Sequence, residues 1–180
     1  MNWQLSHRAE RKALAIADRH YNRQKPGSPQ FVPPGRCFVL TGREGLSLWV
    51  TSWPLAEYVK HDWAGACVNS AFRRESGPVA SELIRDACAA TRWFWPDIPS
   101  VLCIHCGYPI SLVSFIDTDR TRKKRDPGRC YIRAGFTRCR AKTKGGLIVV
   151  HIPPENMPAM KQPFGTGQAF DFSEPLYSCM

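Results

Sequence analysis

Eight cysteines are candidates for chemistry in this chain, and two of them have the spacing of metal ligands. Cys103 and Cys106 enclose two residues, a spacing common among zinc-binding thiolates, and Cys130 and Cys139 could complete a tetrahedral site. Those two do not form a second CxxC pair, and we expect them on different elements. Most of the cysteines stand in apolar runs of a chain without an export signal, which predicts reduced core residues. A zinc site therefore remains the alternative to reduced core cysteines.

A second chemical feature is the positive charge, which is concentrated in one segment. Lysine and arginine number 25 against 15 acidic residues, and residues 120–144 carry eleven basic side chains opposed only by Asp126. Such a concentration is typical of a surface that binds a phosphate backbone, whereas a solvated face without a partner is the alternative. The residues that we expect to contact DNA are Arg120, Arg122, Lys123, Lys124, Arg125 and Arg129.

A pair of side chains, His20 and Tyr21, ends the first predicted helix. Over residues 6–21, Ala13, Ile16 and Ala17 fall on one stripe at helical spacing, and His20 extends that stripe. A proline- and glycine-rich segment, 22–34, then breaks the pattern. The pair is therefore expected in or beside the core, where His20 is either a satisfied structural residue or part of a site.

The remaining pattern predicts an α/β domain. Apolar runs at residues 37–40, 46–51 and 64–72 indicate strands, followed by a helix near Pro78 that carries Leu83 and Ile84 on one face. Residues 111–117 form a strand too apolar to be anything but central, and it ends on Asp117. A short helix at 129–134 closed by Gly135 and two final strands at 136–140 and 147–151 complete the order.

No run of apolar residues reaches the roughly 20 needed to cross a bilayer. The beginning of the chain lacks the apolar core of a secretory signal, so we expect a cytoplasmic protein without a membrane partner. A homodimer is compatible with the sequence.

This order of elements resembles that of the GNAT acyltransferases, with a mixed central sheet flanked by helices. In those enzymes the loop after the fourth strand carries an R/Q-x-x-G-x-G/A pattern that holds the pyrophosphate of acyl-CoA. Here the loop keeps Arg74 and Gly77, but Pro78 removes a donor N–H, and the second small residue, Ala80, comes one position late. The sequence from Tyr131 to Phe136 also resembles the Y-x-x-x-G-F ending of the family's last helix. Residues 1–152 are thus predicted to be a GNAT-like catalytic domain and 153–180 an irregular tail.

A combination of longer motifs resembles the phage Mom proteins over roughly residues 10–150. These motifs are HY at 20–21, SPQFVPPG at 28–35, LWVTSWP at 48–54, NSAFRRE at 69–75, and Asp117 followed by KRDPGRC at 124–130. The resemblance implies an enzyme that converts adenine in double-stranded DNA to N6-carbamoylmethyladenine and so protects phage DNA from host restriction, in the host cytoplasm.

The same resemblance implies a metal and a donor site. An iron ion would be held by His20, Tyr21 and Asp117, with Asp119 as the competitor of Asp117, and these would be the catalytic residues. The residues implied at the small-molecule donor are Asn69, Ser70, Arg73, Arg74 and Gly77. The identity of the carbamoylmethyl donor is open, and the altered loop makes acetyl-CoA a doubtful one.

The implied chemistry suits these residue types. Adenine N6 is a weak nucleophile because its lone pair is delocalised into the ring, and imidazole, phenolate and carboxylate are suitable iron ligands. The base must also leave the stack, and Trp49, Trp53 or Trp63 could stack on it unless they belong to the core.

Two other functions remain open from the sequence. An acyl-CoA-dependent N-acetyltransferase acting on a small amine or a protein would use the same fold but would leave the basic segment unexplained. A non-enzymatic DNA-binding module stapled by zinc would leave His20 and Tyr21 as core residues.

Overall fold

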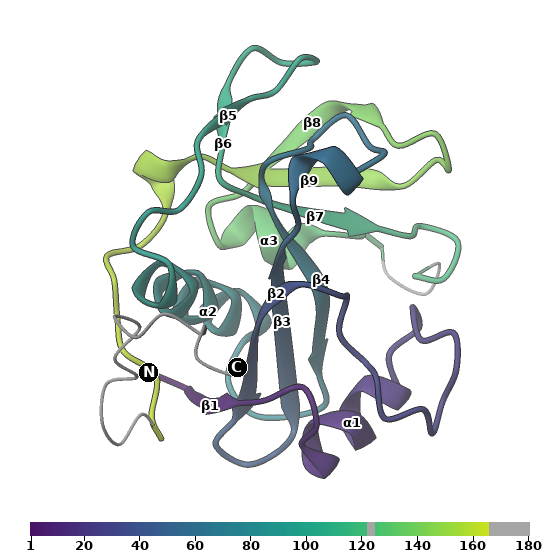
Figure 1. The fold of residues 1–180 in the computed structure, drawn as a ribbon, viewed down its shortest axis with the longest axis vertical. Helices are drawn as coiled ribbons and strands as arrows, with labels where there is room; N and C mark the ends of the chain where they lie inside the picture. Colours follow the sequence, from purple (N-terminus) through teal and green to yellow (C-terminus); the bar gives the residue numbers. More distant parts are fainter. Residues whose placement is uncertain (122–124, 166–180) are drawn as a thin grey trace, which may run out of the picture.

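The computed structural model describes residues 1–121 and 125–165, and these residues form a mixed α/β domain (Figure 1). Lys123 and the neighbouring predicted DNA contacts at 122 and 124 lie outside the described residues, as does the tail from 166. The helices and strands are β1 (Trp3–Ser6), α1 (Arg11–Asp18), β2 (Arg36–Gly42), β3 (Ser47–Trp53), η1 (Ala56–Tyr58), β4 (Cys67–Arg74), α2 (Ala80–Phe94), β5 (Val101–Leu102), β6 (Pro109–Ile110), β7 (Leu112–Ile116), α3 (Arg129–Arg133), β8 (Thr137–Lys142), β9 (Ile148–Ile152) and η2 (Pro154–Asn156).

The main sheet has seven strands in the order β1-β2-β3-β4-β7-β9-β8. β4 and β7 are parallel and are joined through α2, as the strand–loop–helix pattern predicted, while the other pairs are antiparallel. The sheet is strongly twisted, so that β7, β9 and β8 run across the view in Figure 1 while β2, β3 and β4 run nearly upright. The prediction of a mixed sheet with a central β7 is confirmed.

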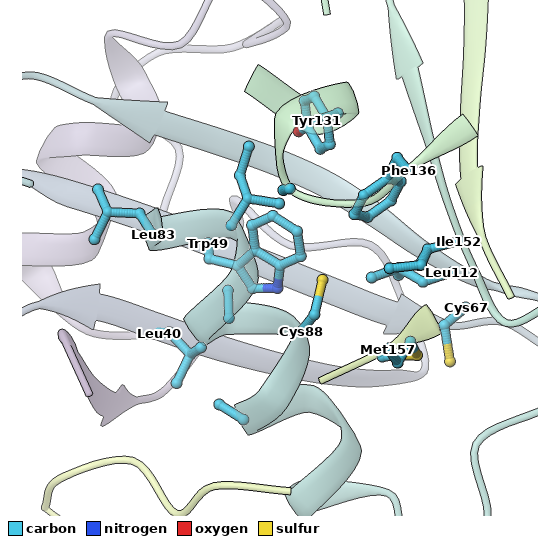
Figure 2. Close-up of a cluster of buried hydrophobic side chains, with 14 of the residues drawn as sticks. Leu40, Trp49, Cys67, Leu83, Cys88, Leu112, Tyr131, Phe136, Ile152 and Met157 are labelled. Carbon is cyan, nitrogen blue, oxygen red and sulfur yellow. The ribbon is translucent and has the colours of Figure 1, made fainter. Parts of the chain in front are cut away.

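α2 and α3 cover one face of the sheet over the largest core cluster. Trp49 stands near the middle of this cluster, with Leu83 and Cys88 of α2 around it and Tyr131 of α3 above it (Figure 2). The Trp49 indole N–H donates to Thr51 Oγ1 at 2.6 Å, so its polar atom is satisfied inside the core. Because side chains alternate along a strand, Val39 and Val50 face the other side, where they pack against α1.

The first helix is shorter than the sequence predicted, because the residues before and after it form other tertiary contacts. Trp3–Ser6 pairs with β2 instead of joining the helix, and the buried Trp3 indole donates to the Leu83 carbonyl at 2.8 Å. At the other end, the Asp18 carboxylate accepts a 2.7 Å bond from Arg23 and a 2.8 Å bond from the Gly27 N–H. His20 and Tyr21 therefore lie beyond the helix, and the prediction of a helix over 6–21 is corrected to Arg11–Asp18.

Gly128 sets the approach of α3 to the sheet. It adopts a φ of +86°, and a Cβ there would meet Ile116 Cδ1 at 2.6 Å. A left-handed residue without a side chain is thus required at this helix start, in agreement with the predicted turn at 126–128. From residue 153 the chain crosses α2 and returns to β1, where the Leu5 N–H donates to the Phe164 carbonyl at 2.8 Å.

Candidate functional site

The candidate site is a cavity that opens where β4 and β7 separate. These two parallel strands pair only over Cys67–Asn69 and Leu112–Ser114, and beyond that point each continues with a different neighbour. The gap contains a cavity of about 160 Å³, which we call the inter-strand cavity. Its wall comes from β4, β7, α3 and the segment after α1, and it is lined by His20, Tyr21, Asn22, Asn69, Ser70, Ala71, Phe72, Arg74, Ala80, Ser114, Phe115, Ile116, Thr121, Gly128, Cys130 and Tyr131.

A bulge in β4 shapes this cavity. The pairing of β3 with β4 shifts between Val50 and Thr51, because Val50 faces Ala71 while Thr51 faces Asn69, and this leaves Ser70 as the extra residue. Ser70 lies 2.9 Å from the Ser52 hydroxyl, and both Ser70 and Ala71 also line a second cavity beside α1. The bulge therefore lets one strand contribute to two adjoining cavities.

Asn69 organises the closed end of the inter-strand cavity. Its amide N–H groups donate to the carbonyls of Val50 and Ala71 at 3.0 and 2.9 Å. Its carbonyl oxygen accepts the Tyr131 hydroxyl at 2.6 Å and the Ser114 hydroxyl at 3.2 Å. Burial raises the pKa of Tyr131 well above its ordinary value. With its amide fully bonded within the protein, Asn69 lies in the cavity wall as a structural group.

His20 and Tyr21 stand together at this cavity. Their rings stack with centroids 4.5 Å apart, and His20 Nδ1 accepts the Asn22 N–H at 3.2 Å. Burial raises the pKa of Tyr21, and the backbone N–H of Asp117, which bonds to the phenol, opposes that shift. Both residues are half-buried. The structure therefore places His20 and Tyr21 beside a cavity, whereas the sequence was compatible with a position either in the core or beside it.

Asp117 adjoins Tyr21 through its backbone, but its carboxylate is engaged in the turn that follows β7. Oδ1 accepts the backbone N–H groups of Asp119 and Arg120 at 2.9 and 3.0 Å, and Oδ2 lies 3.6 Å from Arg120 Nε. Asp119 is exposed. Of the three residues implied as iron ligands, His20 and Tyr21 line the cavity, and Asp117 is not among the lining residues.

The second cavity, which we call the outer cavity, is larger and more open. It has a volume of about 640 Å³ and shares His20, Asn22, Ser70 and Ala71 with the inter-strand cavity. Its other wall is the 22–34 segment, held by Arg23, which pairs with Asp18 and donates to the Gln30 carbonyl at 2.7 Å. The two cavities therefore adjoin at these shared residues, beside the bulge in β4.

The loop between β4 and α2 uses its arginines internally. Arg74 donates to the carbonyls of Pro78 and Gly77 at 2.6 and 2.9 Å, and Gly77 has a φ of +87°. Arg73 bonds to Glu75 at 2.7 Å, as does Arg19 from the end of α1. Arg19 and then Arg73 lower the pKa of the Glu75 carboxyl to about 2. Among the residues implied at the donor site, Asn69, Ser70 and Arg74 line the inter-strand cavity, and Arg73 and Gly77 do not.

The described basic residues of the 120–144 segment are largely exposed. Arg120 donates to the Tyr21 carbonyl at 2.8 Å, which places the start of the segment beside the candidate site. Arg138 of β8 donates to the Pro127 carbonyl at 2.9 Å, so β8 and the start of α3 adjoin. We give the name basic face to four exposed arginines from the turn before α3, from the start of α3 and from β8: Arg125, Arg129, Arg138 and Arg140.

The tryptophans expected as stacking partners are core or edge residues. Trp49 and Trp63 are buried, and Trp53 packs edge-on against Trp95 at 5.8 Å between centroids. None of the three lines the inter-strand cavity or the outer cavity, which agrees with the alternative that they belong to the core. Besides His20 and Tyr21, the aromatic residues that line the cavity are Phe72, Phe115 and Tyr131. They come from three elements, so no local sequence pattern indicated them.

Three of the four cysteines considered for zinc come together. The sulfur atoms of Cys103, Cys106 and Cys139 all lie within 4.8 Å of one another. Cys130 is outside this group and lines the inter-strand cavity from α3, whereas Cys139 lies on β8. The prediction that these two cysteines lie on different elements is confirmed. The four-cysteine set is therefore corrected to three cysteines.

Comparison with protein-family models, with curated proteins and with solved structures finds no match to this chain. Across the described residues, the helices are all too short or too polar to span a membrane.

Proposed function

We propose that this chain is a DNA-modifying transferase with a GNAT-like fold. It replaces one hydrogen on adenine N6 in duplex DNA by a carbamoylmethyl group and so shields the DNA from restriction, as the resemblance to the Mom proteins implies. The observation that carries the proposal is the inter-strand cavity, which has His20 and Tyr21 in its wall and Arg120 bonded to the Tyr21 carbonyl. A base site and a phosphate-binding surface thus adjoin.

Two features of the sheet support the GNAT-like part of the proposal. An antiparallel meander is followed by a strand–helix–strand unit whose parallel strands, β4 and β7, diverge beyond Asn69 and Ser114. The bulge at Ser70 opens β4 toward that divergence. Ligands of open α/β sheets bind beyond the carboxyl ends of parallel strands, and the inter-strand cavity has that position.

The size and lining of the cavity favour a small planar group. Its volume of about 160 Å³ is below the roughly 300 Å³ at which sites for drug-sized ligands begin. Its lining residues include Phe72 and Tyr131, whose rings pack edge-on with centroids 6.1 Å apart, and aromatic and apolar side chains can hold a base that has left the stack. Extruding a base costs a few kcal/mol, and phosphate contacts on the basic face would offset that cost.

Iron is the metal that the resemblance implies, and the donor types fit it. His20 and Tyr21 would hold the ion, with Asp117 as a third ligand once its carboxylate leaves the turn that Asp119 and Arg120 now occupy. When bound, the ion would supply redox or Lewis-acid activation for a transfer to a weak nucleophile. The protein's own contribution is to hold the base against the cavity wall, away from bulk water.

The loop before α2 provides information about the small molecule that donates the carbamoylmethyl group. Arg74 directs its donors to the Pro78 and Gly77 carbonyls, and those carbonyls point toward its guanidinium. A pyrophosphate would need N–H groups there, and Pro78 has none. This favours a donor other than acetyl-CoA and weakens the alternative of an ordinary N-acetyltransferase.

The test is nucleoside mass spectrometry of plasmid DNA from cells that express the full chain. We expect a deoxyadenosine heavier by one carbamoylmethyl group in the wild type, none in His20→Ala, and wild-type amounts in His7→Ala. His7 is exposed and lines neither cavity, so it is a matched control. Unmodified DNA from cells with folded wild-type protein, or acetyl transfer from acetyl-CoA to an amine by the purified chain, would contradict the proposal.

A further inference from the structure

A group of sulfur and nitrogen atoms lies on the opposite face of the sheet from α2 and α3. Cys103 and Cys139 have sulfurs 4.0 Å apart, and the Cys106 sulfur lies 3.7 Å from Nε2 of His151. A tetrahedral zinc ion with Zn–S bonds of about 2.3 Å separates its ligand sulfurs by roughly 3.8 Å, and a sulfur from a nitrogen by roughly 3.6 Å. The three cysteine sulfurs, which all lie within 4.8 Å of one another, therefore have a spacing close to that of zinc ligands, and His151 adjoins one of them. We call these four side chains the cysteine cluster.

The backbone around each sulfur is arranged for thiolates. β5 and β6 form a hairpin around Cys103 and Cys106, closed by the Gly107 N–H to the Cys103 carbonyl at 2.8 Å and the Cys103 N–H to the Tyr108 carbonyl at 2.9 Å. The N–H groups of His105 and Cys106 point to the Cys103 sulfur. Burial alone would raise the pKa of the Cys103 thiol, but these N–H groups together with the Cys106 and Cys139 thiols lower it.

The other two sulfurs have the same kind of partner. The N–H of Tyr108 points to the Cys106 sulfur, and the N–H of Ala141 points to the Cys139 sulfur. Burial and the neighbouring Cys103 nevertheless raise the pKa of both thiols. Backbone N–H groups aimed at sulfur stabilise negative charge on it, so the hairpin and the β8 irregularity after Arg138 give these sulfurs partners that suit them once a metal ion has displaced their protons.

His151 supplies the second, independent observation. It is 2% exposed, and its Nδ1 has no hydrogen-bond partner among the described residues, while Nε2 faces the Cys106 sulfur. Burial lowers the pKa of His151, which keeps the ring neutral and able to ligate. A buried neutral imidazole with sulfur as its neighbour is costly as a core residue, because its polar atoms have left water without gaining strong partners. A cation bound to Nε2 would give that nitrogen a strong partner, with the ring proton on Nδ1.

We propose that Cys103, Cys106, Cys139 and His151 bind one structural zinc ion. Four protein ligands complete a tetrahedral shell and leave no position for substrate, so the site holds structure and does no chemistry. It joins the β5–β6 hairpin, which lies in the connection from α2 to β7, to the outer strand pair of the sheet. Binding transfers the thiol protons to solvent and leaves three thiolates and a neutral imidazole on the ion. This inference does not rest on the proposed function.

Metal analysis of the purified full chain tests the site. We expect one zinc per wild-type chain and loss of nearly all of it in Cys139→Ser. His151→Ala should compete for zinc against a chromophoric chelator at least about ten-fold more weakly, since even outer partners of a metal site contribute that much. Cys130→Ser and His105→Ala are the matched controls and should keep the zinc, because Cys130 lies on α3 and His105 pairs with Asp62 at 2.8 Å.

A second measurement covers the case in which ligand variants do not fold. Cobalt replacing zinc in the wild-type chain should give thiolate-to-cobalt charge-transfer bands with the intensity of three sulfurs and the strong visible bands of tetrahedral cobalt. A folded wild-type chain that carries no zinc and gives no such bands overturns the proposal. So does full zinc in Cys139→Ser, or a Cys103–Cys139 disulfide in the protein purified under reducing conditions. Zinc loss in Cys130→Ser with retention in His151→Ala would reject His151 as the fourth ligand.

Discussion

The inter-strand cavity and the cysteine cluster both gather metal-ligating side chains, yet they differ in how their donors are surrounded. In the cluster, backbone N–H groups point to the sulfurs, the three sulfurs lie within 4.8 Å of one another, and His151, which is 2% exposed, faces the Cys106 sulfur. At the cavity, Asn69 and Tyr131 are bonded to each other deep in the wall, and His20 and Tyr21 are half-buried beside an open space. A closed set of donors favours a structural ion, and an open set beside a cavity favours work on a ligand.

The largest expected effect tests the cavity. His20→Ala and Tyr21→Phe should each lower DNA modification by about 10² to 10⁴, the reduction typical when a group acting directly on the reaction is removed. Their zinc content and melting temperature should stay near the wild type, because the side chains are half-buried and lie beyond α1. If instead modification and melting temperature fall together, the pair is structural and the distinction between the two regions fails. Quantitative nucleoside mass spectrometry and calorimetry provide both values.

Removing the metal tests the cluster. A strong zinc chelator should lower the melting temperature of the wild-type chain by about 10 °C, since a destabilisation of about 3 kcal/mol shifts a domain of this size by roughly 6–12 °C. The same shift is expected in His20→Ala, because that residue belongs to the other region. Added zinc should reverse the shift, whereas added iron should not. An unchanged melting temperature after complete metal removal would show that the cluster contributes no stability.

A smaller effect is expected for the basic face, which connects the two regions. On β8, Cys139 points into the cluster while Arg138 and Arg140 point to the side of α3. Replacing Arg129 and Arg140 by alanine should reduce the slope of log affinity for duplex DNA against log salt by about one unit for each phosphate that the variant no longer binds. Arg11→Ala with Lys12→Ala on the exposed side of α1 is the control for net charge. Equal slopes in both variants would place the DNA surface elsewhere.

The smallest effect concerns the loop beside the cavity and its pH dependence. Arg19 and Arg73 lower the pKa of Glu75 to about 2, below its ordinary value of 4.5. The ionised carboxylate therefore stabilises the folded chain above pH 4.5, and this contribution disappears as the pH falls toward 2. The melting temperature of Glu75→Gln should lie a little below the wild type at neutral pH, and the difference should shrink over that acid range. A difference independent of pH would mean that the ion pairs contribute nothing.

Local patterns in the sequence predicted a large part of the sheet. Alternating or continuous apolar runs indicated β2, β3, β4 and β7, and the parallel pairing of β4 with β7 followed from the helix between them. Such patterns depend on neighbouring residues and on burial of one face, so they can be recognised in a short segment without knowledge of the rest of the chain. β1 was missed, because Trp3–Ser6 becomes a strand only by pairing with β2.

The sequence by itself determined where ligand-type residues stand along the chain: the CxxC pair at Cys103, the His20–Tyr21 pair, and the carboxylate after β7. Only the tertiary structure decided which of them meet. The pairing of β8 with β9 brings Cys139 and His151 to the hairpin, and Cys130 is turned to the other face on α3. The bulge at Ser70 and the early separation of β4 from β7 create the cavity. Contacts between residues dozens of positions apart depend on sheet register and twist, which no local run of residues encodes.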